Sequence, residues 1–431
     1  MKLFRSDPRG LAGLLLSLFA SACLAQDPPH AEGQGLRLSG FGTAGLTHTV
    51  APEGWGFLRG IDQGSNSGGT QFATDSRLGL QVNYAVDSHF EAVGQFMLAS
   101  RSDYDKNSDA IEWLFGAYRP NAHLTLRAGR LNTDNFLMSD YRNVGFAYPF
   151  LRPPVEYYGS IPTALDGIDV TRTWDDGDNQ WRAKVMVGSV KVSGVTLSPG
   201  YGGSLTHEGD GLTLRAGIQR ARFRNVSPGL QQLLDGLGQF SAGLALLPPQ
   251  AAPIAGPMAA EARALAASVD YNHTTLTYGT LGAAYDTGTW QIQAELTHVV
   301  GGPTSSFKSG YLSIGRNIGS VTVFGIASAA TSHRAPTSEP AWGPALLQLG
   351  LPAASAQQAQ MLGDAGYMAA TLLIAQRTLS IGARWALMPR MDLKVQVDHT
   401  TISTAGGELW SHPSLGGGHA STVGVALDFA F

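Results

Sequence analysis

The residues whose types and spacing could do chemistry gather between positions 127 and 184. Most of them lie in the segment 135–159, where charged side chains of both signs stand among aromatic rings. The candidates are Asp140, Tyr141, Arg142, Tyr148, Arg152 and Glu156, with Arg127, Arg130, Arg182 and Lys184 in the flanking segments. Guanidinium groups that face carboxylates create a transverse field, and such a field orients polar solutes and excludes apolar ones.

No pattern of a common catalytic or metal site accompanies these charges. The chain has no glycine-rich phosphate loop between a strand and a helix, and no His-Glu-x-x-His pattern. Its one cysteine, Cys23, excludes a disulfide framework and a paired-cysteine metal site. Asp398 and His399 are adjacent, so in a strand their side chains would face opposite sides. We therefore expect neither an enzyme nor a cofactor.

The segment 135–159 is too aromatic for a loop that is exposed to water. Its three prolines, Pro149, Pro153 and Pro154, restrict the backbone and stiffen it. We therefore expect the segment to pack on a wall that other parts of the chain supply.

Outside this segment, the dominant pattern of the chain is an alternation of apolar and polar residues with period two. In the last segment Val423, Val425 and Leu427 alternate with small or polar residues up to Phe431. The same alternation runs through 391–398 and 290–297. Each such strand has one apolar face and one polar face.

The pattern predicts sixteen strands. Their ranges are 36–48, 76–86, 89–100, 110–119, 123–131, 167–174, 180–192, 201–207, 211–224, 275–286, 289–300, 307–317, 320–331, 377–388, 391–402 and 421–431. Tight turns follow the even strands, whereas longer connections follow the odd ones, with 301–306 as a short exception. Two of the longer connections, 225–274 and 332–376, are predicted to be long extracellular loops, and 193–200 is predicted to be another of the longer, variable loops on that side.

Segregation of loop lengths by parity indicates an all-β, antiparallel up-and-down barrel that spans a membrane. The 43% apolar and 14% charged residues fit neither a typical soluble enzyme nor a helical membrane protein, and the net charge of −4 carries no nucleic-acid signature. A bilayer requires every backbone polar group to be paired, and ring closure achieves this. Aromatic residues that recur beside the tight turns fit an interfacial girdle: Tyr84, Phe90, Tyr118, Trp290, Trp385 and Phe431.

Residues 1–25 have the pattern of a signal peptide, and 26–431 are predicted to form a single barrel domain. Basic residues precede the apolar run 11–22, and small residues end at Ala25. The run is shorter than the ~20 residues of a spanning helix, which disfavours a membrane anchor. Lipidation at Cys23 is an alternative, although Ala20 stands where a lipoprotein site usually has Leu.

With its leader, its opening strand Leu36–Phe41 and its alternating last strand ending in Phe431, the chain resembles the sixteen-stranded Gram-negative outer-membrane porins. The resemblance implies location in the bacterial outer membrane, a homotrimer, and contact with lipid and lipopolysaccharide. It also implies that Phe431 is read by the barrel-assembly machinery. In porins the third long loop folds into the lumen and sets its narrowest point, which implies that role for 132–166.

Two interpretations of the charges remain open. Asp140, Arg142, Arg152 and Glu156 either set the field of a constriction or pair with the wall and only hold the loop. The basic residues of the strands either form the basic side of the aperture or are ordinary lumen residues: Arg127, Arg130, Arg182 and Lys184, with Arg77 and Arg384.

Two features near the outer loops also yield expectations. Arg220, Arg222 and Arg224 are out of phase with Arg215, which predicts a bulge or an emergence from the bilayer near residue 219. Arginines at such a rim would attract anions or bind lipopolysaccharide phosphates. Alanine-rich insertions at about 230–268 and 340–376 are expected to be short helices that pack over the mouth or against neighbouring subunits.

These observations favour a water-filled channel for passive diffusion of small hydrophilic solutes. One alternative is a selective channel in which the tyrosines and phenylalanines of 136–158 form a sliding surface for sugars or aromatic acids. The other is a barrel whose outer loops act as an enzyme or an adhesin.

Overall fold

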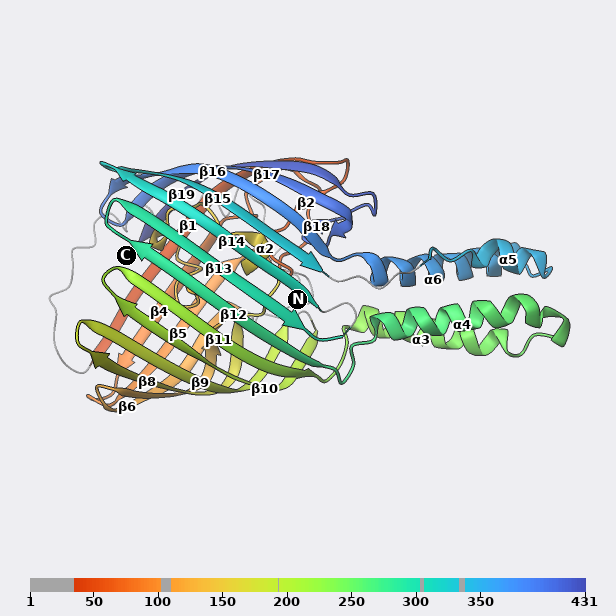
Figure 1. Ribbon diagram of the computed structural model, residues 1–431, viewed down its shortest axis with the longest axis horizontal. Coiled ribbons are helices and arrows are strands. Elements are labelled where there is room, and N and C mark those ends of the chain that lie inside the picture. The colour runs from red at the N-terminus through yellow and green to blue at the C-terminus, as the bar shows by residue number, and fades with distance from the viewer. Residues whose placement is uncertain (1–34, 102–109, 193, 303–305, 333–337) are drawn as a thin grey trace.

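Sixteen antiparallel strands close into a ring in the computed structural model, which describes residues 35–101, 110–192, 194–302, 306–332 and 338–431 (Figure 1). The ring strands are β1 (Gly35–Val50), β4 (Arg77–Ala85), β5 (Phe90–Ala99), β6 (Ile111–Asn121), β7 (Leu124–Asn132), β8 (Ala164–Asp176), β9 (Asn179–Val192), β10 (Val195–Gly209), β11 (Leu212–Phe223), β12 (Thr275–Asp286), β13 (Trp290–Val300), β14 (Phe307–Ile318), β15 (Val321–Ser332), β16 (Ile374–Met388), β17 (Met391–Gly407) and β19 (Gly418–Ala430). Each strand pairs with its neighbours in sequence, and β1 closes the ring against β19 from Phe41↔Ala430 to Val50↔Ser421.

Three short strands lie outside this count. The strand β3 (Gly69–Gln71) pairs with the upper end of β1, and β2 (Gly56–Phe57) pairs with β18 (Trp410–Ser411). The predicted signal peptide, residues 1–25, lies outside the described residues.

All sixteen predicted strands are confirmed, with one substantial correction. The prediction of a loop at 193–200 is wrong, because β10 begins at Val195 and pairs with β9 and β11 along most of its length. A register shift between Leu197 and Gly200, followed by Gly202 and Gly203, interrupts the alternation from which strands were predicted.

The two faces of the ring differ as the alternation predicts. Outward positions expose apolar side chains, as at Leu296 (64%) and Ile381 (68%). Inward positions carry polar groups: in β17, Val395 and Val397 face outward, whereas Asp392 and Lys394 are fully buried inside. The predicted girdle residues are all exposed, and Phe90 stacks on Tyr118 with ring centroids 4.5 Å apart. The outer face is therefore suited to hydrocarbon and the inner face to water.

Of the two expectations for β11 near residue 219, a bulge or an emergence from the bilayer, the bulge is absent. The register of β11 with β12 runs without a shift from Leu212↔Tyr285 to Arg222↔Thr275. Arg220 and Arg222 therefore share the outward face with Ile218. Charge appears on that face because these residues lie at the loop end of the strand, beyond its apolar stretch.

Two helical hairpins project from the end of the barrel opposite the tight turns (Figure 1). They are α3 (Pro228–Leu244) with α4 (Ala252–Val269), and α5 (Trp342–Gln348) with α6 (Ala353–Thr371). A shared apolar core that includes Leu237, Ala262 and Trp342 joins them. The expectation that they pack over the mouth is wrong, because they pack against each other and extend away from the ring. None of the helices in the described ranges is long and apolar enough to cross a bilayer.

Candidate functional site: the lumen and its inserted loop

The connection between β7 and β8, residues 133–163, folds into the ring and packs on the inner face of one half of the wall. It contains the short helix α2 (Val155–Tyr158). Its buried side chains form one apolar cluster with residues of β12, β13, β14 and β15: Phe136, Met138, Tyr148, Phe150 and Tyr157 against Tyr278, Val299, Tyr311, Phe324 and Ile326. The expectation that this aromatic segment packs on the wall is confirmed.

Glu156 anchors α2 to the wall and does not border open space. It is 1% exposed, and its carboxylate accepts hydrogen bonds from Ser328 Oγ and Gln376 Nε2, each at 2.7 Å, and from Thr378 Oγ1. Near the start of the loop, the amide nitrogen of Leu137 donates to Glu295 Oε2 of β13 at 2.8 Å. Glu156 is therefore corrected from a constriction residue to an anchor.

Arg152 is a second anchor. Its guanidinium lies between two carboxylates, 2.7 Å from Asp75 Oδ2 and in direct contact with Asp398, and it donates to Thr47 Oγ1 at 3.0 Å. Burial alone would raise the pKa of Asp75, but Arg152 and Arg59 outweigh burial and hold that pKa below its usual value. The same two carboxylates raise the pKa of Arg152 although burial opposes this. Arg152 is thus removed from the predicted aperture.

Tyr148 provides a third contact that anchors the loop to the wall. Its hydroxyl accepts from Arg77 Nη2 at 2.9 Å and donates to the carbonyl of Arg142 at 3.1 Å. Lys394 Nζ donates to the carbonyl of Tyr148 at 2.7 Å and lies 3.0 Å from Asp428. For Arg152 and Glu156 the geometry supports the alternative that they hold the loop, and Tyr148 contributes to the same anchoring.

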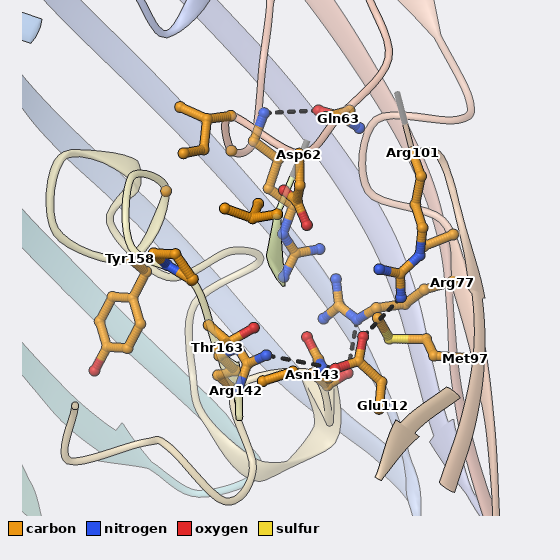
Figure 2. A pocket seen from close by; sticks show the side chains of 18 of the residues that line it. Asp62, Gln63, Arg77, Met97, Arg101, Glu112, Arg142, Asn143, Tyr158 and Thr163 are labelled. Atoms are coloured by element: carbon orange, nitrogen blue, oxygen red, sulfur yellow. Dashed lines mark hydrogen bonds and ion pairs between the residues drawn. The ribbon is translucent and has the colours of Figure 1, made fainter. Parts of the chain in front are cut away.

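The other half of the lumen, toward β4–β9, contains two cavities. The upper cavity, on the loop side, has a volume of about 330 Å³, and Figure 2 shows Arg77, Arg101, Arg142 and Glu112 converging there. Glu112 pairs with Arg101 at 2.7 Å and with Arg142 at 3.6 Å. The lower cavity, toward the tight turns, has a volume of about 570 Å³.

Four of the predicted residues meet at the lower cavity. They are Arg127, Asp140, Arg182 and Lys184. Asp140 lies 3.8 Å from Arg182 and accepts from Asn132 Nδ2 at 2.5 Å. Arg127 binds Asp169 through Nε at 3.0 Å, and Lys184 lies 3.7 Å from the buried Asp134. Tyr141 is 38% exposed, unlike Tyr148, the other aromatic residue of the predicted set.

Arg130 does not join this group. It lies opposite Leu114 and Asp166 in the register, and Leu114 is exposed on the outward face. Its Nε is 2.9 Å from Asp166 at the edge of the upper cavity. Residues three apart in a strand alternate between faces, so Arg127 and Arg130 cannot be a pair on one face. Arg384, in turn, pairs with Asp392 at 2.5 Å under the loop and lies against Phe146.

Sequence reasoning missed several residues of the open half, notably Arg59, Arg101, Glu112 and Arg119. The alternation gives no signal for Arg119, because Trp113, Phe115 and Ala117, which share its phase in β6, are apolar. Arg59 lies in the connection between β1 and β4, whose path into the lumen has no periodicity to reveal it.

Comparison with known proteins shows the class of fold. No family model matches the chain, and no curated protein matches it. An anion-selective porin from Comamonas acidovorans is 12% identical, with a TM-score of 0.51 over 92% of this chain and all of the other. OmpF of Salmonella typhi in complex with daunomycin is 11% identical, with a TM-score of 0.53 over 93% of this chain and 98% of the other. OmpT of Vibrio cholerae is 9% identical, with a TM-score of 0.50 over 94% and 100%.

These similarities establish a porin-like barrel fold for the chain. They confirm the predicted resemblance at the level of fold.

Proposed function

We propose that the protein is a channel of the bacterial outer membrane through which small hydrophilic solutes diffuse passively. The observation that carries this proposal is the contrast between the two faces of one closed ring. Apolar side chains are exposed around the outside, while the inside holds polar groups and two cavities beside a tightly anchored loop. A sixteen-stranded ring is too wide for wall side chains to fill, so an aqueous passage remains.

The location and partners follow from the same proposal. The leader pattern at 1–25 supports export, and the exposed girdle supports insertion in the outer membrane. Assembly as a trimer, contact of the rim arginines with lipopolysaccharide, and recognition of Phe431 by the barrel-assembly machinery belong to the proposal. The position of Phe431 is compatible with recognition by the barrel-assembly machinery. It lies at the end of the closing strand, where it pairs with Gly40 of β1 through two backbone hydrogen bonds of 2.8 Å.

The alternative with an aromatic sliding surface loses its main support. Phe136, Tyr148, Phe150 and Tyr157 are buried against the wall, so a passing solute does not contact their faces. A barrel whose outer loops bind a partner is the second candidate, and the projecting helices α3–α6 favour it. The two candidates predict opposite results in a lipid bilayer.

Conductance across a planar bilayer tests the proposal. Purified protein is expected to give stepwise, voltage-independent ion currents at low voltage. Deletion of the arm 228–269 is the matched variant: because the arm extends away from the lumen, the single-channel conductance should be unchanged. Inserted, folded protein without any conductance would reject the channel and favour the second candidate.

A further inference from the structure

We infer that the open half of the lumen is a basic pathway for small organic anions, with the lower cavity as a transient site for a carboxylate. This inference rests on the proposed channel function. It concerns which solutes the channel prefers, and the formal charge of the whole chain does not decide this, because loops and buried pairs contribute to that charge without facing the passage.

Basic side chains dominate the lining of both cavities. The lower cavity is lined by Arg119, Arg127, Arg182 and Lys184, against Asp140 as its acidic side chain. In the described part of the chain, the upper cavity is lined by Arg59, Arg77, Arg101, Arg142 and Lys191 against Asp62 and Glu112, while Arg130 and Asp166 reach its edge from the outward face of β7 and β8. A solute that crosses the open half therefore meets positive charge in succession.

Most of these cations have carboxylate partners. In three of the pairs the cation is more exposed to the lumen than the carboxylate. The side chain of Arg119 is 45% exposed and that of its partner Glu91 11%; the values are 16% and 2% for Arg127 and Asp169. Arg101 and Glu112 follow the same order, with 21% and 8%. In these three pairs the carboxylate lies deeper, against the wall, so the guanidinium group faces the water and its charge acts on a solute at close range.

Asp140 is the exception in the lower cavity. It is 49% exposed, more than Arg182 at 33%, and it belongs to the inserted loop and not to the wall. The carboxylate of Asp140 lies opposite several cations, so it repels anions and reduces the preference of the cavity for them. Its removal should therefore shift selectivity in the direction opposite to removal of an arginine.

The chemistry of the lower cavity points to carboxylates. Guanidinium groups present paired donors that match a carboxylate, whereas chloride uses only the charge. Trp113 and Phe41 line the same cavity and offer apolar surface to the body of an organic acid. Its volume of about 570 Å³ lies within the range of small-molecule sites.

The reversal potential in a potassium chloride gradient tests the charge of the pathway. The wild-type channel should pass chloride in preference to potassium. The double variant R119Q/R182Q removes two unit charges and should lower the chloride-to-potassium permeability ratio at least fivefold, because one unit charge at 4 Å in water already has roughly that effect. D140N should raise the ratio. The control is R316Q/R377Q, which removes the same charge from the outward face of β14 and β16 and should leave the ratio unchanged.

Block of the chloride current tests the site. Potassium benzoate should reduce the current, benzamide at the same concentration should not, and R119Q/R182Q should weaken the block several-fold. Preference for potassium, equal effects of benzoate and benzamide, or insensitivity to all three lumen substitutions would overturn the inference while leaving the channel standing. Absence of conductance would instead reject the proposed function.

Discussion

Replacement of Arg152 by methionine is expected to release the inserted loop from the wall. Arg152 is fully enclosed and bridges Asp75, from the connection before β4, and Asp398, from β17. Methionine preserves much of the side-chain volume but leaves two buried carboxylates without their cation. Breaking a buried ion pair in this way costs about 3–5 kcal/mol, because the remaining charge stays desolvated.

The pH dependence follows from the lowered pKa of Asp75. A carboxyl group with a lowered pKa contributes stability that is present above its ordinary pKa and is lost as the pH falls through its value in the folded protein. In R152M the stronger of the two lowering partners is gone and Arg59 alone remains, so burial shifts the pKa of Asp75 upward and protonation relieves the variant. The stability difference between wild type and R152M should therefore be largest near neutral pH and narrow as the pH falls toward 4.

Urea unfolding of the protein in lipid vesicles, at pH 7.5 and at pH 4, measures this difference. Single-channel recordings of the same variant should show larger and noisier currents, because a loop without its clamp no longer occupies half of the lumen. The variant R152M/D75N should recover part of the lost free energy, and R220M, on the outward face, serves as control. If R152M unfolds within about 1 kcal/mol of wild type at pH 7.5, the reasoning is refuted.

Three further substitutions test other parts of the structure. E156L leaves the donors of Ser328, Gln376 and Thr378 without their acceptor and should lower the free energy of unfolding by about 1–3 kcal/mol, whereas E156Q should lower it less; equal losses would contradict the anchoring role. W342A removes the largest side chain of the core shared by the two helical hairpins, and with it the 2.6 Å hydrogen bond to Glu261. Limited proteolysis should therefore cut the hairpins faster while the single-channel conductance stays constant. A changed conductance would place the hairpins in the passage. L296R puts a charge on the outward face and should make the free energy of folding into vesicles less favourable by about 2–4 kcal/mol if the position lies near the bilayer midplane. Unimpaired insertion would contradict the lipid-facing assignment.

Much of the fold could be predicted because the bilayer imposes a strict period of two on the strands. The outward residues of β13 and β17 are apolar at nearly every second position, so the pattern predicts both ends of β13 and the start of β17 within a residue, whereas β17 continues to Gly407, five residues beyond its predicted end. The pattern does not predict the start of β10, because Pro199 argues against a strand and the register shift between Leu197 and Gly200 breaks the alternation there.

The candidate site was harder to predict, because a loop has no period and charge alone does not reveal a partner. Aromatic content was enough to show that 135–159 packs on the wall. It could not show that Arg152 and Glu156 point into the wall while Asp140 faces open space, since that depends on Asp75, Asp398, Ser328 and other residues that are distant in sequence. The same holds for the two helical hairpins, whose mutual packing joins segments about 100 residues apart.

The central claim is that one face of these strands contacts hydrocarbon and the other contacts water, and two positions of β8 test it most directly. Ile168 is exposed on the outward face, and Thr171 lines the lower cavity. A fluorophore attached at I168C in a C23S background, with the protein in vesicles, should be quenched by nitroxide lipids and not by aqueous iodide. A fluorophore at T171C should show the reverse, and quenching of both positions by iodide alone would contradict the account.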